Sequence, residues 1–332
     1  MKKTKILIFE YIIGGGLNKS ALPNALAREG LLMLQTIIDD LSKLEHSIEP
    51  MIMLDWRVVE KVSCHSCSIF IIKSEHDSHQ EFVRLISTCD AVWPIAPESD
   101  GILQSLCEAV EQTGKVLLTS PAHAVAIAGN KWLTYQCLLQ HSIATPHTCL
   151  LKGFSYDAGE WIIKSVDGVG CEDSYLIDSQ DEFAKLSSRL VQDHYLVQAH
   201  LQGEKISLSC LFKDGHGWLV CANKQQFVVI DKRYHLTEIT VNFTSDLSKY
   251  QALVQEVAVA MPTLWGYVGI DLIETADQIF VLEINPRLTT SYAGIDQALG
   301  VNCVRAALEL WSGKEPQLQP THNQPVHLDI NG

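Results

Sequence analysis

Three oxygen-bearing side chains lie close together toward the end of the sequence: Asp271, Glu283 and Asn285. Residues 268–273 and 279–284 form two apolar runs around a polar stretch, a pattern that predicts a β-hairpin. Side chains two residues apart on a strand share a face, and the paired strand can bring Asp271 beside Glu283 and Asn285. Two carboxylates and an amide oxygen suit Mg²⁺, which often shares its ligand shell with substrate phosphates. The alternative is a strand pair whose outer face is merely acidic.

Arg287 follows this set directly, and its planar guanidinium is suited to holding a phosphate or a carboxylate. Asp271 and the segment Glu283-Ile-Asn285-Pro-Arg287 together resemble the metal-binding end of ATP-grasp ligases, in which an Asp precedes the pattern Glu-x-Asn-x-Arg. The resemblance implies that the protein uses ATP and that Asp271, Glu283 and Asn285 bind Mg²⁺, with Mn²⁺ as an alternative ion. It also implies a catalytic role for Arg287.

Two lysines extend the resemblance. Lys131 stands at the start of a predicted helix over residues 130–140, and Lys164 ends a predicted strand over residues 160–164. ATP-grasp ligases carry a lysine at the start of a helix and a second lysine just before a glycine loop. The resemblance therefore implies that Lys131 and Lys164 belong to the ATP-binding residues.

A glycine-containing loop follows Lys164. Gly168 and Gly170 stand four and six residues beyond this lysine, as in the Lys-Pro-x-x-Gly-x-Gly loop of the family. Such loops offer backbone N–H groups to phosphate oxygens. Ser165 replaces the proline of the family and Cys171 replaces the glycine that often comes next, so the match is partial.

Residues 198–204 resemble the hinge that holds adenine in this family. The resemblance implies that backbone groups near residues 199–201 read the adenine edge and that Glu204 accepts the ribose hydroxyls. The alternative for His200 is that of an ordinary connecting residue. The nucleotide-binding residues implied for this hinge are Gln198, Ala199, His200, Leu201 and Glu204.

Lys224 stands in a long predicted strand over residues 218–230. A lysine in mid-strand that faces a cleft would suit the γ-phosphate of ATP, whereas a lysine on the solvent face is the commoner arrangement in proteins generally. The resemblance favours the cleft, and with it a catalytic role for Lys224 beside that of Arg287.

The first 120 residues alternate short apolar strands with helical patterns, which predicts a parallel sheet with helices on both faces. Ligands on such sheets bind at the carboxyl ends of the strands. Two loops lie there, residues 10–16 and 94–100, and each is either a ligand loop or a tight turn. Their candidate substrate-binding residues are Glu10, Tyr11, Gly15 and Glu98.

The fold class that follows is α/β, with α+β character in the ATP-binding part. The resemblance implies an open parallel-sheet pre-ATP-grasp domain over residues 1–120, then a two-lobed ATP-grasp domain. Its small lobe would span residues 121–200, and its large lobe, with the metal site, residues 201–332. A dehydrogenase is disfavoured, because Lys19 stands where the Gly-x-Gly-x-x-Gly dinucleotide motif needs its third glycine.

The chain has 332 residues, of which 47% are hydrophobic, and a formal net charge of −14. A chain this acidic repels nucleic-acid backbones. We find no apolar stretch long enough to span a bilayer and no signal peptide, so we expect a cytoplasmic protein with reduced thiols and no nucleic-acid or membrane partner. Among ten cysteines, Cys64 and Cys67 have a metal-like spacing but lack the second pair of a zinc finger.

At finer grain, Phe9-Glu10-Tyr11 with its following glycines and the Ile95-Ala-Pro-Glu98 loop resemble the tyramine–glutamate ligases of methanofuran synthesis and their relatives linked to methylofuran. The resemblance implies an ADP-forming ligase that joins glutamate to tyramine, tyrosine or a related amine through an acyl phosphate. Its partners would be small-molecule carboxylates and amines, with Arg287 to bind a substrate carboxylate and Glu10 or Glu98 to bind a substrate ammonium group. Assembly as a homodimer is left open. The alternatives are an ATP-binding regulatory protein without turnover and a ligase of other amino acids or peptides.

Overall fold

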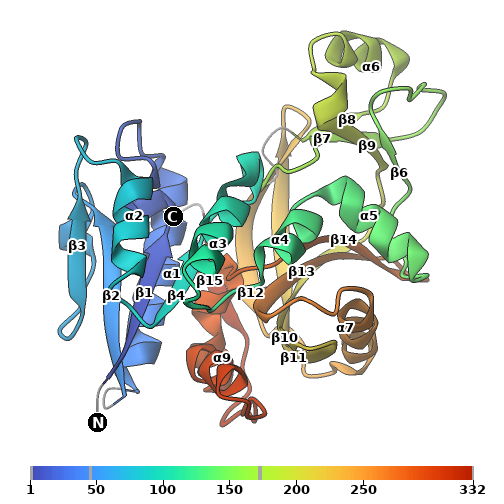
Figure 1. Ribbon diagram of the computed structural model, residues 1–332. Helices are drawn as coiled ribbons and strands as arrows, with labels where there is room; N and C mark the ends of the chain where they lie inside the picture. Colours follow the sequence, from blue (N-terminus) through green and yellow to red (C-terminus); the bar gives the residue numbers. More distant parts are fainter. Residues whose placement is uncertain (1–2, 45–46, 171–173, 331–332) are drawn as a thin grey trace.

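The computed structural model describes residues 3–44, 47–170 and 174–330 (Figure 1). The first part of the chain forms a five-stranded parallel sheet with the order β3-β2-β1-β4-β5. Its central strands are fully buried, as expected where helices cover both faces of a sheet. The strands are β1 (Thr4–Glu10), β2 (Ile48–Asp55), β3 (Ser68–Ile72), β4 (Ala91–Ile95) and β5 (Val116–Leu117).

Helices cover this sheet on both sides and confirm the predicted α/β class. Helix α1 (Asn24–Ser42) packs on the face that carries Ile6 and Ile8. Helices α2 (Ser78–Ile86) and α3 (Ile102–Gln112) pack on the opposite face. Short 3-10 turns, η2 (Val59–Lys61) and η3 (Ser99–Gly101), lie in the connections.

The loop after β1 is a single turn of π-helix, η1 (Ile12–Gly16). Gly15 adopts a φ of 104°, which disfavours residues with a side chain. A Cβ at this position would also lie 2.5 Å from Ile72 at the end of β3. The backbone conformation and the contact with Ile72 therefore require glycine at position 15, whether or not a ligand binds nearby.

A second, four-stranded sheet with the order β6-β9-β7-β8 forms the small lobe. Helix α6 (Gln180–Ser187) begins at the Ser179 cap, and its Phe183 packs on Ile163 and Val197 of this sheet. A 3-10 turn, η4 (Gln192–His194), leads into β9. The strands are β6 (Thr148–Leu150), β7 (Trp161–Ser165), β8 (Tyr175–Ile177) and β9 (Tyr195–Ala199).

A third, six-stranded sheet with the order β14-β13-β10-β11-β12-β15 forms the large lobe. Two of its strands, β12 and β15, were not predicted from the sequence. β15 gains its partner by pairing with the edge of β12. The strands are β10 (Glu204–Lys213), β11 (His216–Ile230), β12 (Arg233–Val241), β13 (Gly266–Glu274), β14 (Ile279–Asn285) and β15 (Val326–Asp329).

Helices also cover both faces of the large sheet. One face packs on α4 (Ala122–Ala128), α5 (Lys131–Gln140) and α7 (Ser248–Ala260). Thus α4 and α5, which the sequence analysis assigned to the small lobe, contribute apolar side chains to the core of the large sheet.

The other face packs on η5 (Thr290–Gly294), α8 (Ile295–Leu299) and α9 (Cys303–Trp311), and these elements contact α1 of the first domain. Tyr292 donates to Asp40 Oδ2 at 2.7 Å across this contact.

The ends of β11 and β12 extend beyond the large sheet as a hairpin arm, residues 226–236, toward the small lobe (Figure 1). The backbone N–H of Leu176 donates to the Lys232 carbonyl at 3.0 Å, and Lys232 Nζ pairs with Asp178 at 3.0 Å. Arg233 lies 4.5 Å above the ring of Tyr175. The arm therefore joins the two lobes in addition to their chain connections.

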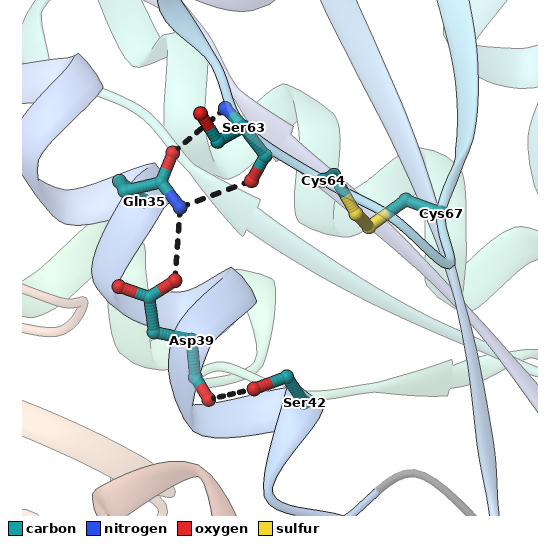
Figure 2. Close-up of a disulfide and its surroundings, with 6 residues drawn as sticks. All are labelled: Gln35, Asp39, Ser42, Ser63, Cys64 and Cys67. Atoms are coloured by element: carbon teal, nitrogen blue, oxygen red, sulfur yellow. Dashed lines mark hydrogen bonds between the residues drawn. A yellow bond between two sulfur atoms is a disulfide. The ribbon is translucent and has the colours of Figure 1, made fainter.

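Cys64 and Cys67 form a disulfide in the loop before β3 (Figure 2). The expectation of reduced thiols is wrong for this pair, because the loop brings their Cα atoms to 5.8 Å, within the range that a disulfide spans. Gln35 of α1 holds the same loop through both backbone groups of Ser63, at 3.0 and 3.1 Å. Within the described residues, no helix is long and apolar enough to cross a membrane.

Candidate active site

The predicted β-hairpin is present, and its strands place Asp271 directly opposite Glu283. The amide Nδ2 of Asn285 donates to Asp271 Oδ2 at 2.9 Å. Gln225 of β11 donates to Asp271 Oδ1 at 3.2 Å. The structure therefore brings the three predicted metal-binding side chains together on one face of the large sheet, with Gln225 beside them.

Lysines give the two carboxylates different electrostatic surroundings. Lys131 Nζ lies 3.0 Å from Glu283 Oε2. Burial raises the pKa of Glu283, but the Lys131 and Lys164 ammonium groups outweigh it and hold that pKa well below its usual range. Burial, followed by the Glu283 charge, raises the pKa of Asp271 to about 7. Near neutral pH Glu283 is therefore ionised, whereas Asp271 is only partly ionised.

This donor set fits a hard divalent cation. Carboxylate oxygens face each other from adjacent strands, and Asn285 can add its amide oxygen, all ligands that Mg²⁺ prefers. Burial and the Glu283 charge raise the pKa of Asp271, and a cation between the two carboxyl groups would offset this repulsion. No group of three or more His, Cys, Asp or Glu side chains in residues 3–44, 47–170 and 174–330 is arranged for a metal, which leaves this mixed carboxylate–amide face as the candidate.

The glycine loop packs close to the face that carries Asp271 and Glu283. Lys131 donates from its backbone to the Val166 carbonyl at 2.7 Å and from its side chain to the Gly168 carbonyl. A cavity of only about 10 Å³ remains under the loop, which is too small for a phosphate. Gly170, with a φ of 61°, is the last residue described in the loop, and Cys171 lies outside the described residues. Nucleotide binding therefore requires the loop to lift.

The predicted hinge already has partners within the chain. The N–H groups of Ala199 and His200 donate to the carbonyls of His147 and Glu160, so these two groups do not point to an adenine in this conformation. Gln198 is buried and donates to Thr148 at 2.9 Å. Leu201 is the second residue after the end of β9.

His200 is more than a connecting residue. Its ring bonds to Glu160 at 2.8 Å and to Tyr234 at 2.7 Å. Tyr234 belongs to the arm and was not foreseen, because only the lobe arrangement brings β12 to the hinge.

Lys224 is not in the cluster around Asp271. Asn223, Ser207 and Asp271 are aligned across three strands, so their side chains share a face, and Lys224 must face the other side. There it pairs with Glu204 at 2.7 Å, and both side chains are largely exposed. In this conformation, neither the γ-phosphate role of Lys224 nor the ribose role of Glu204 is supported. Strand alternation would have indicated Gln225 once the face of Lys224 was known.

Arg287 is bound by Glu98 of the first domain. The guanidinium Nε lies 2.9 Å from Glu98 Oε1, and Nη2 lies 3.0 Å from Oε2. We expected Glu98 to hold a substrate ammonium and Arg287 to hold a substrate anion. The structure instead pairs the two side chains, which the sequence separates by 189 residues.

Glu10 is buried at the carboxyl end of β1, where its Oε2 accepts the Ile13 N–H at 2.8 Å. A Cβ at Gly30 would lie 2.7 Å from the same oxygen, so only glycine fits there. Burial raises the pKa of Glu10 to about 8, despite that hydrogen bond and the Arg287 charge. Burial and Asp100 also raise the pKa of the adjacent Tyr11. Glu10 is therefore mostly protonated at neutral pH, rather than the carboxylate that we expected.

The sequence matches two families along its length. Residues 48–125 match the pre-ATP-grasp domain, and residues 128–291 match the ATP-grasp domain. The tyramine–L-glutamate ligase of Methanocaldococcus jannaschii is 26% identical over 294 residues, which cover 87% of this chain and 84% of that protein. The tyramine–L-glutamate ligase of Methanocaldococcus fervens is also 26% identical, over 87% of this chain and 89% of its own.

Solved structures share the fold. An ATP-grasp superfamily protein from Archaeoglobus fulgidus superposes with a TM-score of 0.72 at 22% identity, covering 98% of this chain and 92% of the other. The L-amino acid ligase from Bacillus licheniformis superposes with a TM-score of 0.67 at 14% identity, covering 97% and 75%. With these two matched domains, which together cover most of its length, the chain belongs to the ATP-grasp proteins, and the curated proteins that it is similar to are ligases.

Proposed function

We propose that the protein uses ATP and Mg²⁺ to join glutamate to tyramine, tyrosine or a related amine, in a pathway of the methanofuran or methylofuran type. The observation that carries the chemistry is the facing pair Asp271 and Glu283, with Lys131 and Lys164 acting on Glu283. The substrates are suggested by the tyramine–L-glutamate ligases that match most of the chain. Assembly as a homodimer stays a prediction.

The reaction must bring a negatively charged carboxylate to a negatively charged triphosphate, and the cationic groups of the site would reduce their repulsion. Bound Mg²⁺ would neutralise phosphate charge and help align the transferred group. Lys131 and Lys164 attract phosphate oxygens, and Arg287 holds the acid. The lifted glycine loop then closes and excludes water, which protects an acyl phosphate from hydrolysis. The carboxylate takes the γ-phosphoryl group of ATP, which forms the acyl phosphate and releases ADP. The amine then attacks the acyl carbon, displaces phosphate and loses a proton, which leaves the amide.

The proposal is tested by measuring ADP release with each substrate omitted in turn. We expect release only when glutamate, an aryl amine and Mg²⁺ are all present, together with an amide product identified by mass spectrometry. Release with another acid would retain the ligase and reject glutamate. Tight ATP binding with no release under any combination of amino acids and amines would instead favour a regulatory nucleotide-binding protein.

Lys164 supplies a separate prediction about ATP affinity. This lysine is nine-tenths buried at the end of β7, beside the glycine loop and near Glu283. Lys164→Met should remove one charge-assisted contact to a phosphate and weaken ATP binding by roughly 1.5–3 kcal/mol, as measured by calorimetry. Lys152→Met, which removes an exposed lysine from the same lobe, is the matched control. Equal ATP affinity in both variants would remove Lys164 from the site.

A further inference from the structure

The ion pair of Arg287 and Glu98 lies where the first domain meets the large lobe. Arg287 follows β14 and Glu98 follows β4, so each side chain leaves the carboxyl end of a strand of a different sheet. Only 16% of the Arg287 side chain and 5% of that of Glu98 are exposed. Glu98 also lines the small cavity under the glycine loop, together with Lys131, Glu283 and Asn285. The pair therefore borders the proposed reaction site.

Glu98 occupies one edge of the Arg287 guanidinium and leaves another edge for a second partner. Glu98 takes the edge formed by Nε and Nη2, and the Leu288 carbonyl accepts from Nη1 at 3.1 Å. A guanidinium has five N–H groups in one fixed plane. Among the described residues, three of these groups have acceptors, so the Nη1–Nη2 end keeps donors for an incoming pair of anionic oxygens.

Gly129 leaves space for the Glu98 side chain. A Cβ at Gly129 would lie 2.9 Å from Glu98 Cβ and 3.0 Å from its Cγ, so the absence of a side chain at Gly129 gives Glu98 its room. Both carboxylate oxygens of Glu98 already accept hydrogen bonds from Arg287. An arginine without this partner would have other carboxylates within electrostatic reach, since Asp271 and Glu283 both act on Arg287.

We propose that Glu98 is a positioning residue, which holds Arg287 so that the free end of its guanidinium receives the carboxylate of the acid substrate and then its acyl phosphate. The inference rests on the proposed ligase function and deepens it. It gives Glu98 a role in binding the acid substrate and no role in binding the amine. It also makes the first domain a participant in acid binding, although the arginine belongs to the large lobe.

The test is a double-mutant cycle with Glu98→Gln and Arg287→Lys, measured as ADP release while each substrate is varied. Glutamine keeps the size of Glu98 but replaces one acceptor oxygen with an amide N–H₂ that faces a donor. We expect the KM of the acid to rise by roughly tenfold or more in Glu98→Gln, while the KM values of ATP and of the amine stay unchanged. The double variant should have the same acid KM as Arg287→Lys alone, because each change disrupts the same Glu98–Arg287 interaction.

Glu29→Gln is the matched control, since Glu29 of the first domain accepts a hydrogen bond from Thr290 of the large lobe at 2.6 Å. A rise in the KM of the amine instead of the acid would overturn the inference. So would equal changes in all three KM values, or effects of the two variants that simply add.

If wild-type protein releases no ADP with any acid, the proposed function fails, and the inference is decided by calorimetry of inorganic phosphate binding to the MgADP complex. Equal loss of phosphate affinity in Glu98→Gln and Arg287→Lys supports a positioned guanidinium. Loss in Arg287→Lys alone rejects it.

Discussion

Glu283→Gln is expected to abolish ATP turnover while the protein remains folded. Glu283 faces Asp271 and lies 3.0 Å from Lys131, so it is the ionised member of the carboxylate pair. The glutamine keeps the shape and can still accept from Lys131, but it removes the negative charge that a metal ion needs. Loss of the preorganised charge that stabilises a transition state commonly costs about 10²–10³-fold in rate. Steady-state ADP release at saturating Mg²⁺ measures the effect.

The control for this change is Glu274→Gln on the same hairpin. Glu274 also pairs with a lysine, Lys249, but its side chain lies on the face opposite to Asp271. Its replacement should alter thermal stability more than turnover. A Glu283→Gln enzyme that retains wild-type turnover would reject the metal site, whatever the control shows.

Glu10→Gln is expected to stabilise the protein at alkaline pH. Folding raises the pKa of Glu10 from 4.5 to about 8, so the unfolded chain loses this proton at a lower pH than the folded protein does. The wild-type free energy of unfolding therefore falls as the pH rises from 4.5 to 8 and levels off above that. Glutamine does not titrate and can still accept the Ile13 N–H. The variant should gain on the order of 4 kcal/mol over wild type at pH 8.

Urea unfolding of both proteins at pH 5 and pH 8 measures this difference. Glu60→Gln, which replaces an exposed carboxyl group of the same domain, is the matched control. If Glu10→Gln shifts the free energy equally at the two pH values, then Glu10 does not keep its proton on folding. That outcome would restore the carboxylate predicted for ammonium binding.

The clustering of the candidate metal-binding side chains could be predicted because its information is local. Asp271, Glu283 and Asn285 belong to one hairpin, and the period of two along a strand is sufficient to place two of them on one face. The open parallel sheet could also be predicted, because each of its strands is a short apolar run between helical patterns. These features need no knowledge of distant residues.

The features that sequence reasoning missed depend on distant pairing. The face on which Lys224 lies follows from its alignment with Ile206, which the sequence of β11 alone does not reveal. The partner of Arg287 comes from another domain, and Tyr234 meets His200 only because the arm crosses to the small lobe. The raised pKa of Glu10 likewise depends on its burial in the folded protein, which the local sequence does not reveal.

The hairpin arm affects how the small lobe can move. Residues 141–147 and 200–203 connect the lobe to the rest of the chain, and two connections by themselves permit rotation about the line between them. The Lys232 contacts with Asp178 and Glu182 are a further link between the arm and the lobe, and a rotation that separates the two would break them. All three side chains are substantially exposed, so dissolved ions screen their attraction. Salt should therefore ease the outward swing of the lobe even as it weakens the attraction of a triphosphate to the lysines beneath.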